Sequence, residues 1–257
     1  MLFPGEKGLE KGAESTYNVS APGKEKRRGR ETIASRRGRA LGKKDSFMKA
    51  AVFGAGNMGL DIAQVFAVKG HDVVVRDISD ELIQKGEERL KASLARQVEK
   101  GRRTQAEADA ISAKIVFTTN MRQAADADLI VEAIVENVSI KKDLFRQLDT
   151  IVKPEAIFAT NTSSISPTEL ASATKRADRF IGMHFFNPAT VMKLIEVIRG
   201  ANTSQETFTT VYELAESLGK EPIEVAEAPG FVVNKILIPM INEAIGLVET
   251  GVATPED

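Results

Sequence analysis

Short apolar runs alternate with amphipathic stretches along the chain from Met48 onward. The apolar runs predict β-strands at residues 50–53, 71–77, 115–118, 129–135, 156–160, 180–185, 194–198 and 221–226. Several of the stretches between them repeat their apolar residues every three or four positions, which is the period of a helix. Because strands that alternate with helices are joined by right-handed crossovers, we predict an α/β fold with a doubly wound, mostly parallel sheet.

Capping signals refine the borders of the predicted helices. A helix over residues 60–68 is expected to end before Gly70, and Ser79 can cap a long helix that follows the second strand. Thr104-Gln-Ala-Glu107 has the pattern of a capping box and opens another short helix. Beyond Pro229-Gly230, residues 231–248 are expected to form a mostly apolar helix that needs a partner to cover it.

The same pattern divides the chain into three parts. Residues 48–226 hold all the predicted strands, and residues 227–257 begin a separate helical part. Residues 1–47 show no apolar period and carry 12 Lys and Arg against 6 Asp and Glu, so this basic extension is expected to be disordered. It lacks interleaved aromatics and the apolar core of a secretory signal, which favours a solvated tail over a nucleic-acid-binding arm. We interpret Met48 as the natural start and residues 1–47 as extra translated sequence.

The amino-acid composition excludes several kinds of reaction site. The chain of 257 residues has no Cys, which excludes disulfides and thiolate chemistry and fits a reducing, cytoplasmic location. Its only histidines are His71 and His184, so no metal site is expected. No apolar stretch is long enough to span a membrane. His71 has the polar Asp72 beside it and is assigned to the surface.

The first chemical motif is the glycine triplet Gly54-x-Gly56-x-x-Gly59. It follows a predicted strand, opens a helix, and precedes a second strand that ends at Asp77, as in the dinucleotide-binding fingerprint of a Rossmann-type domain. The Asp77 carboxylate suits ribose hydroxyls and repels a 2′-phosphate, which favours NAD over NADP. Arg76 beside it weakens that preference. The alternative is a glycine turn between packed elements.

A second group of polar residues follows two later strands. Asn161-Thr-Ser-Ser164 comes after one of them and His184-Phe-Phe-Asn-Pro188 after another. Loops at the carboxyl ends of parallel strands are where such folds bind ligands. A histidine there suits an alcohol dehydrogenase, which needs a base for the hydroxyl proton. Taken alone, His184 between apolar neighbours fits a buried core residue equally well.

Six motifs together resemble one family. They are Gly54-Ala-Gly-Asn-Met-Gly59, Val131-Glu-Ala-Ile-Val-Glu-Asn137, Asn161-Thr-Ser-Ser164, His184-Phe-Phe-Asn-Pro188, Met192-Lys-Leu-Ile-Glu-Val197 and Pro229-Gly-Phe-Val-Val-Asn234. In this order they closely resemble the short-chain L-3-hydroxyacyl-CoA dehydrogenases, which include bacterial 3-hydroxybutyryl-CoA dehydrogenases. The resemblance covers the chain from Met48 to its end. It implies reversible oxidation of a short (S)-3-hydroxyacyl-CoA to the 3-ketoacyl-CoA, with NAD as the cofactor.

The resemblance also implies roles for particular residues. His184 corresponds to the general acid/base and Glu196 to its partner, while Ser163 and Asn234 correspond to groups that hydrogen-bond the reacting oxygen and the thioester. The cofactor-binding positions are Gly54, Gly56, Asn57, Met58, Gly59, Asp77, Glu136, Lys141 and Asn187. Ser93 and Lys100 on the long helix, together with Ser163, correspond to positions that meet coenzyme A. Lys100 also suits the end of a helix, where a cation complements the helix dipole.

Two departures from the family qualify what the resemblance implies. The family continues beyond Asp257 with further helices, so the second, all-α domain is expected to be incomplete here, and Asn57 stands where a threonine is commoner. The family pattern implies a homodimer when that domain is complete. A non-catalytic, crystallin-like role on the same scaffold and a related hydroxy-acid or sugar-acid dehydrogenase remain as alternatives.

Overall fold

The structure is a computed structural model that describes residues 48–256. The expected disorder of residues 1–47 lies outside the described residues. The strands are β1 (Lys49–Phe53), β2 (Asp72–Arg76), β3 (Ile115–Thr118), β4 (Leu129–Glu132), β5 (Ile157–Thr160), β6 (Phe180–Phe185), β7 (Leu194–Arg199) and β8 (Glu221–Ala226). The helices are α2 (Asn57–Val68), α3 (Asp80–Glu99), α4 (Gln105–Ala113), α5 (Val138–Ile151), α6 (Pro167–Ala171), α7 (Gln205–Ser217) and α8 (Val233–Glu249), with 3-10 turns η1 (Met121–Ala124) and η2 (Ala177–Arg179).

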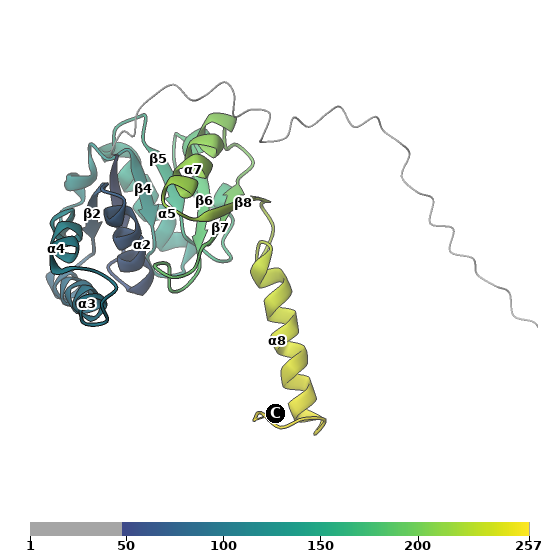
Figure 1. Cartoon of the computed structure of the whole chain (residues 1–257). Helices are drawn as coiled ribbons and strands as arrows, with labels where there is room; N and C mark the ends of the chain where they lie inside the picture. The colour runs from purple at the N-terminus through teal and green to yellow at the C-terminus, as the bar shows by residue number, and fades with distance from the viewer. Residues whose placement is uncertain (1–47, 257) are drawn as a thin grey trace, which may run out of the picture. The chain divides into compact units, whose positions relative to one another are not determined.

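The eight strands form one sheet in the order β3-β2-β1-β4-β5-β6-β7-β8 (Figure 1). All neighbouring strands run parallel except β6 and β7, which are antiparallel. The chain winds outward from β1 to β3 and then returns to β4 on the other side of β1. The carboxyl ends of β1 and β4 therefore form the topological switch point, where such sheets bind ligands. The predicted doubly wound, mostly parallel fold is confirmed.

Helices cover both faces of the sheet because the strands are apolar on both sides. One core packs side chains of α2, α3, α4 and α7 against one face, with Phe66 among its fully buried residues. The other core packs α5 and α6 against the opposite face around Phe145, Phe158 and Phe180. These two layers hold the strand ends in fixed positions.

The predicted helix starts are present. The Ser79 hydroxyl accepts the amide of Leu82 at the start of α3. Thr104 and Glu107 form the expected capping box at the start of α4. Both caps satisfy amides that the first turn of a helix leaves without partners.

Two local predictions were wrong. The strand predicted over residues 129–135 ends at Glu132, because the Glu132 carboxylate accepts the amide of Ile134 and turns the chain out of the sheet. His71, assigned to the surface, is buried with 9% of its surface exposed. Its ring lies edge-on to Phe66 at 5.8 Å, and its Nδ1 accepts the amide of Met48 at 3.2 Å.

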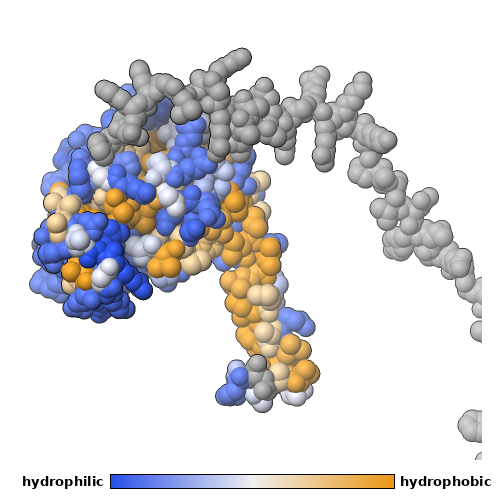
Figure 2. All heavy atoms as spheres, in the orientation of Figure 1, coloured by the Kyte–Doolittle hydropathy of each residue, from blue (hydrophilic) through white to orange (hydrophobic). Residues whose placement is uncertain are grey.

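Helix α8 differs from the other helices because none of its residues is buried. Figure 2 shows apolar side chains along its length. Its exposed large apolar residues are Ile236, Leu237, Ile238, Met240, Ile241, Ile245, Leu247 and Val248. Over the described residues, no helix is both long and apolar enough to cross a membrane.

Candidate functional site

The glycine loop connects β1 to α2 at the switch point. Gly54 has a φ of 110°, and a Cβ there would lie 2.5 Å from the carbonyl oxygen of Ala133 on the neighbouring segment. A Cβ on Gly59 would lie 1.8 Å from the carbonyl oxygen of Gly54, so only glycine lets α2 begin this close to β1. The first turn of α2 therefore points its free amides at the carboxyl edge of the sheet, where an anionic group is favoured.

A cavity of about 830 Å³ lies between this loop and the end of β2. Its lining includes Gly54, Gly56, Asn57, Met58 and Asp77. The Asp77 carboxylate is held by two amides, since one oxygen accepts from Ala55 and the other from Ile78, each at 2.7 Å. A braced carboxylate at this position can accept hydrogen bonds from ribose hydroxyls, and the residues present fit the adenosine half of a dinucleotide.

Arg76, the residue that weakens the preference for NAD, also lines this cavity. Its Nε donates to the carbonyl oxygen of Thr119 at 3.3 Å, and its guanidinium lies 6.0 Å from the centre of the Phe53 ring. These contacts engage the guanidinium with groups of the protein itself. Arg76 and Asp77 therefore both border the cavity, and each is also held by contacts within the protein.

A second cavity of about 320 Å³ collects most of the predicted reaction-site residues. Its lining includes Met58, Glu136, Lys141, Ser163, His184, Asn187 and Asn234. These residues come from the first turns of α2, α5 and α8, from the loops after β4, β5 and β6, and from β6 itself. Met58 borders both this cavity and the larger one, so the two cavities adjoin at the glycine loop.

His184 and Glu196 form a buried pair beside this cavity. They are directly opposite each other in the antiparallel β6–β7 ladder, and the Nδ1 of His184 lies 2.7 Å from an Oε2 of Glu196. Glu196 is fully buried, and its other oxygen accepts the amides of Val232 at 2.9 Å and Val233 at 3.0 Å. Because amides can only donate, this environment suits an ionised carboxylate, which assigns the Nδ1 proton to the imidazole. The Nε2 of His184 is then left for a ligand in the cavity.

The His184 ring is also held by aromatic contacts. Its centre lies 4.6 Å from that of Phe186 and 5.7 Å from that of Phe231. Nearby, the side-chain oxygen of Asn161 accepts the amide of Phe185 at 2.8 Å, which ties the end of β5 to the end of β6. The imidazole therefore has a defined orientation at the cavity wall.

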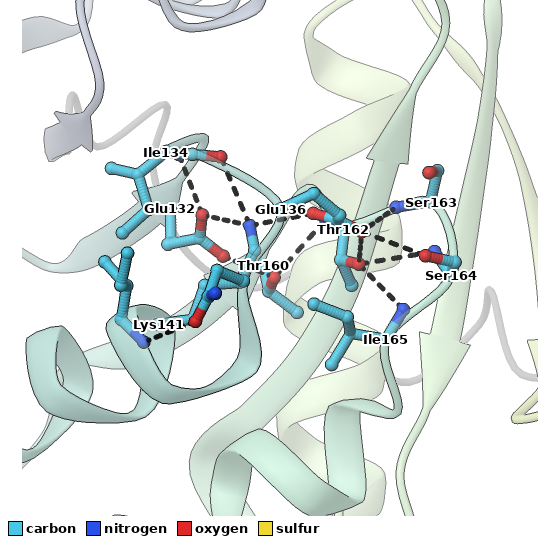
Figure 3. Close-up of polar contacts among 11 residues, drawn as sticks. Glu132, Ile134, Glu136, Lys141, Thr160, Thr162, Ser163, Ser164 and Ile165 are labelled. Carbon is cyan, nitrogen blue, oxygen red and sulfur yellow. Dashed lines mark hydrogen bonds and ion pairs between the residues drawn. The ribbon is translucent and has the colours of Figure 1, made fainter.

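On the other side of the cavity, Glu136 and Lys141 belong to a polar network (Figure 3). The Lys141 ammonium lies 2.5 Å from Glu132 and 3.1 Å from Glu136. Glu136 also accepts hydrogen bonds from the hydroxyls of Thr162 and Ser164 and from the amide of Ser163. Burial raises the pKa of Glu136, but the Thr162 hydroxyl and the Lys141 charge outweigh it and hold the pKa below its ordinary value. Glu136 is thus a charged group on the wall.

Glu136 was expected at a strand end. It lies four residues beyond the end of β4, in the loop that leads to α5. Glu132, the residue that does end the strand, was missed by sequence reasoning. Its signal was an acidic residue within an apolar run, where a charge is buried only with partners.

A third cavity, of about 700 Å³, contains Ser93 and Lys100 on its wall. The other basic residues that line it are Lys69, Arg96, Arg102, Arg103 and Lys220. Arg96 lies one helical turn before Lys100, and Arg102 and Arg103 follow the end of α3, so the clustering was visible in the sequence although it was not singled out. A wall with this many cations fits a ligand that carries phosphates.

Lys220 and Asp61 border this third cavity from opposite elements. The Lys220 ammonium donates to the carbonyl oxygens of Ala189 and Met192. Burial lowers the pKa of Lys220, and the nearby Asp61 carboxylate opposes that shift. Burial also raises the pKa of Asp61, against the hydrogen bonds of the Thr190 and Ala189 amides. The two residues were not expected from the sequence, and together they hold the loop between β6 and β7.

Comparison with known proteins identifies the family. A family model described as the NAD binding domain of 3-hydroxyacyl-CoA dehydrogenase matches residues 49–228. This match covers well over half of the chain. The chain belongs to the 3-hydroxyacyl-CoA dehydrogenase family. The model of the C-terminal domain of 3-hydroxyacyl-CoA dehydrogenase matches residues 230–257.

Individual members of the 3-hydroxyacyl-CoA dehydrogenase family are similar over the same region. The 3-hydroxybutyryl-CoA dehydrogenase of Clostridioides difficile is 51% identical over 210 residues, which cover 82% of this chain and 75% of that protein. A probable 3-hydroxybutyryl-CoA dehydrogenase of Deinococcus radiodurans is 54% identical over 209 residues, covering 81% and 75%. The crystal structure of (S)-3-hydroxybutyryl-CoA dehydrogenase from Ralstonia eutropha has a TM-score of 0.79 and 48% identity, covering 82% of this chain and 75% of that chain.

Proposed function

We propose that His184 is the general acid/base with which this chain interconverts a short (S)-3-hydroxyacyl-CoA and the 3-ketoacyl-CoA. The family is that of an NAD-dependent oxidoreductase acting on 3-hydroxyacyl-CoA. The observation that carries the role of His184 is its 2.7 Å contact with the buried Glu196 at the wall of a cavity that adjoins the glycine loop. The names of the similar proteins favour a four-carbon substrate.

The acid–base step follows from the geometry of the pair. When bound, the nicotinamide supplies a hydride acceptor for C3 of the substrate. The Nε2 of His184 takes the proton of the C3 hydroxyl, and the Nδ1 proton stays on the ring toward Glu196. The carboxylate fixes the tautomer and stabilises the imidazolium that forms, as in other His–carboxylate pairs. In the reductive direction, the same nitrogen returns the proton.

Ser163 and Asn234 are placed in this proposal as donors to the oxygens of the substrate. Both line the cavity with His184. Hydrogen bonds from a hydroxyl and an amide favour the negative charge that develops on the reacting oxygen and the thioester. Glu136, Lys141 and Asn187 line the same cavity and are assigned to the nicotinamide side.

The other two cavities described above are assigned to the rest of the cofactor and to coenzyme A. The cavity at Asp77 fits the adenosine half of NAD, and a carboxylate there disfavours NADP. The cationic cavity at Ser93 and Lys100 is assigned to the phosphates of coenzyme A. Arg96 lines the same wall and adds a further positive charge.

We also propose that the protein assembles as a homodimer through its helical part. The support is the apolar surface of α8, none of whose residues is buried. Apolar side chains exposed along a whole helix favour a partner that covers them. We further propose domain borders at 47/48 and 226/227. We also propose a cytoplasmic location.

The test is the replacement of His184 by Gln. His184→Gln is expected to lower kcat with acetoacetyl-CoA and NADH by about 10³-fold, because the proton donor is gone. NADH binding, measured by fluorescence titration, is expected to stay near wild type. The matched control is His71→Gln, which alters the chain's other histidine at the opposite edge of the sheet and should retain activity.

Near-normal turnover in His184→Gln would overturn the assignment of the base. Turnover of a free hydroxy acid but not of its thioester by the wild-type chain would favour the hydroxy-acid dehydrogenase alternative. NADH binding without turnover of either substrate would favour the non-catalytic one.

A further inference from the structure

Glu132 is a buried charge that the proposed reaction does not use. It is fully buried at the end of β4 and lies beneath Lys141, which forms part of the cavity wall. Its carboxylate accepts the amide of Ile134 at 2.8 Å, the Lys141 ammonium at 2.5 Å and the Thr160 hydroxyl at 2.6 Å. Two of these three partners can only donate, which is the environment of an ionised carboxylate.

The network has one carboxylate more than neutrality requires. Lys141 supplies one positive charge, and Glu132 and Glu136 supply two negative charges (Figure 3). A buried ammonium is neutralised by one carboxylate, whereas Lys141 has two within ion-pair distance, Glu132 at 2.5 Å and Glu136 at 3.1 Å. With both carboxylates ionised, the network of Glu132, Glu136 and Lys141 therefore carries a net charge of −1.

The described surroundings do not cancel this charge. The ionisable residues that line the cavity are Glu136, Lys141 and His184. The nearest charges along α5 are already matched, since Lys142 pairs with Glu169 and Asp143 pairs with Arg146. The wall that carries Glu136 and Lys141 thus faces the cavity with a fixed negative charge.

We infer that Glu132 makes this wall discriminate between the two redox forms of the cofactor, favouring NAD⁺ over NADH. The inference rests on the proposed function, which assigns this wall to the nicotinamide. The nicotinamide ring carries a positive charge in NAD⁺ and none in NADH, so a fixed negative charge stabilises the oxidised form selectively. Glu132 acts through the electrostatic field and does not contact the cofactor.

The expected change in NAD⁺ affinity follows from Coulomb's law. Two unit charges about 10 Å apart give an affinity difference of roughly twofold in water and about twentyfold at the dielectric constant typical of protein sites. Glu132→Gln removes the charge and keeps the shape. The Gln amide can still accept from Lys141, and it can donate to the Thr160 hydroxyl once that hydroxyl reorients.

The experiment measures the dissociation constants of NAD⁺ and NADH separately, by calorimetry and by fluorescence, for wild type and Glu132→Gln. The expected result is weaker NAD⁺ binding by about two- to twentyfold with little change for NADH. The ratio of the two constants is the readout, because general damage to the site weakens both forms together. A ratio equal to that of wild type, or a shift toward NAD⁺, would overturn the inference.

Two control variants separate charge from hydrogen bonding. Thr160→Val removes a hydrogen bond of Glu132 without changing the charge, and its ratio should match wild type. Glu227→Gln removes a carboxylate that bonds Thr168 away from the cavity lining, and it too should leave the ratio unchanged. An equal shift in either control would contradict the assignment to Glu132.

If Glu132→Gln fails to fold, a second variant of the same network tests the inference. Glu136→Gln makes the same change in the charge of the network and should shift the ratio in the same direction. An unchanged ratio in folded Glu136→Gln would refute the inference while leaving the proposed function intact. Failure of the wild-type chain to bind either form of the cofactor would instead refute the proposed function, and the inference with it.

Discussion

The two histidines of the chain lie at opposite edges of the same sheet. His71 directly precedes β2 at the amino edge, and His184 is near the end of β6 at the carboxyl edge. Both imidazoles are buried, and each lies against a phenylalanine ring. Residue type, burial and aromatic contact are therefore alike at the two positions.

The partner of Nδ1 distinguishes them. At His71 this nitrogen accepts the amide of Met48, so the ring is held neutral with Nδ1 as an acceptor. At His184 it faces the Glu196 carboxylate, which requires a proton on Nδ1 and stabilises a positive ring. The difference teaches that the group facing Nδ1 distinguishes two buried histidines: an amide leaves this nitrogen an acceptor, whereas a carboxylate favours the proton-transfer role that we propose for His184.

Replacing Glu196 tests this comparison with the largest expected effect. Glu196→Gln gives His184 a neutral partner, and kcat is expected to fall by about 10²- to 10⁴-fold, as when the carboxylate of other His–carboxylate pairs is removed. Steady-state assays with acetoacetyl-CoA measure it. Glu224→Gln, a change of a half-exposed carboxylate on the adjacent strand β8, is the control and should keep full activity. Equal activity in Glu196→Gln and Glu224→Gln would contradict the proposed role of Glu196.

Removing the Ser163 hydroxyl has an intermediate expected effect. Ser163→Ala is expected to lower kcat by about ten- to a hundredfold, the value of one hydrogen bond to a developing charge. NADH affinity should stay unchanged. Ser164→Ala is the matched control, because the Ser164 hydroxyl bonds Glu136. An unchanged kcat in Ser163→Ala would contradict the proposed role of the Ser163 hydroxyl.

His71 provides the smallest expected effect, on stability. Burial lowers the pKa of His71, and the Lys114 charge acts in the same direction against Asp72. In the folded protein the neutral ring is favoured, so its contribution is complete above the unfolded value of 6.5 and is lost as the pH falls through the window below it. The loss approaches about 1.4 kcal/mol per pH unit inside that window.

Urea unfolding from pH 7 to pH 5 measures this loss. The free energy of unfolding should fall less steeply in His71→Gln than in wild type. Parallel curves would mean that His71 is not held neutral.

Much of the sheet, and the grouping of most candidate reaction-site residues around one cavity, were predictable from the sequence. The strands at residues 115–118, 180–185 and 221–226 have the predicted bounds, because each is a compact run limited by turn or cap residues. His184 lies close to the glycine loop because the carboxyl ends of parallel strands share one edge of the sheet. The resemblance to the family indicated Glu196, which the period of apolar residues alone does not identify.

The parts that were missed depend on contacts between distant segments. The run at residues 129–135 stays apolar past Glu132, and nothing in its pattern shows that a side chain bonds the amide of Ile134 and ends the strand. The burial of His71 depends on Phe66 and Met48, while its neighbour Asp72 suggested exposure. A residue's nearest neighbours in sequence are weak evidence for its environment when tertiary packing decides it.

The single antiparallel pairing in the sheet has a consequence for how the family can diversify. His184 and Glu196 are register partners on adjacent strands, so the ladder itself sets their separation. The connecting residues between β6 and β7 form a loop at the cavity end, outside that ladder. Insertions or deletions in this loop can reshape the walls of two cavities that it lines without changing the separation of His184 and Glu196.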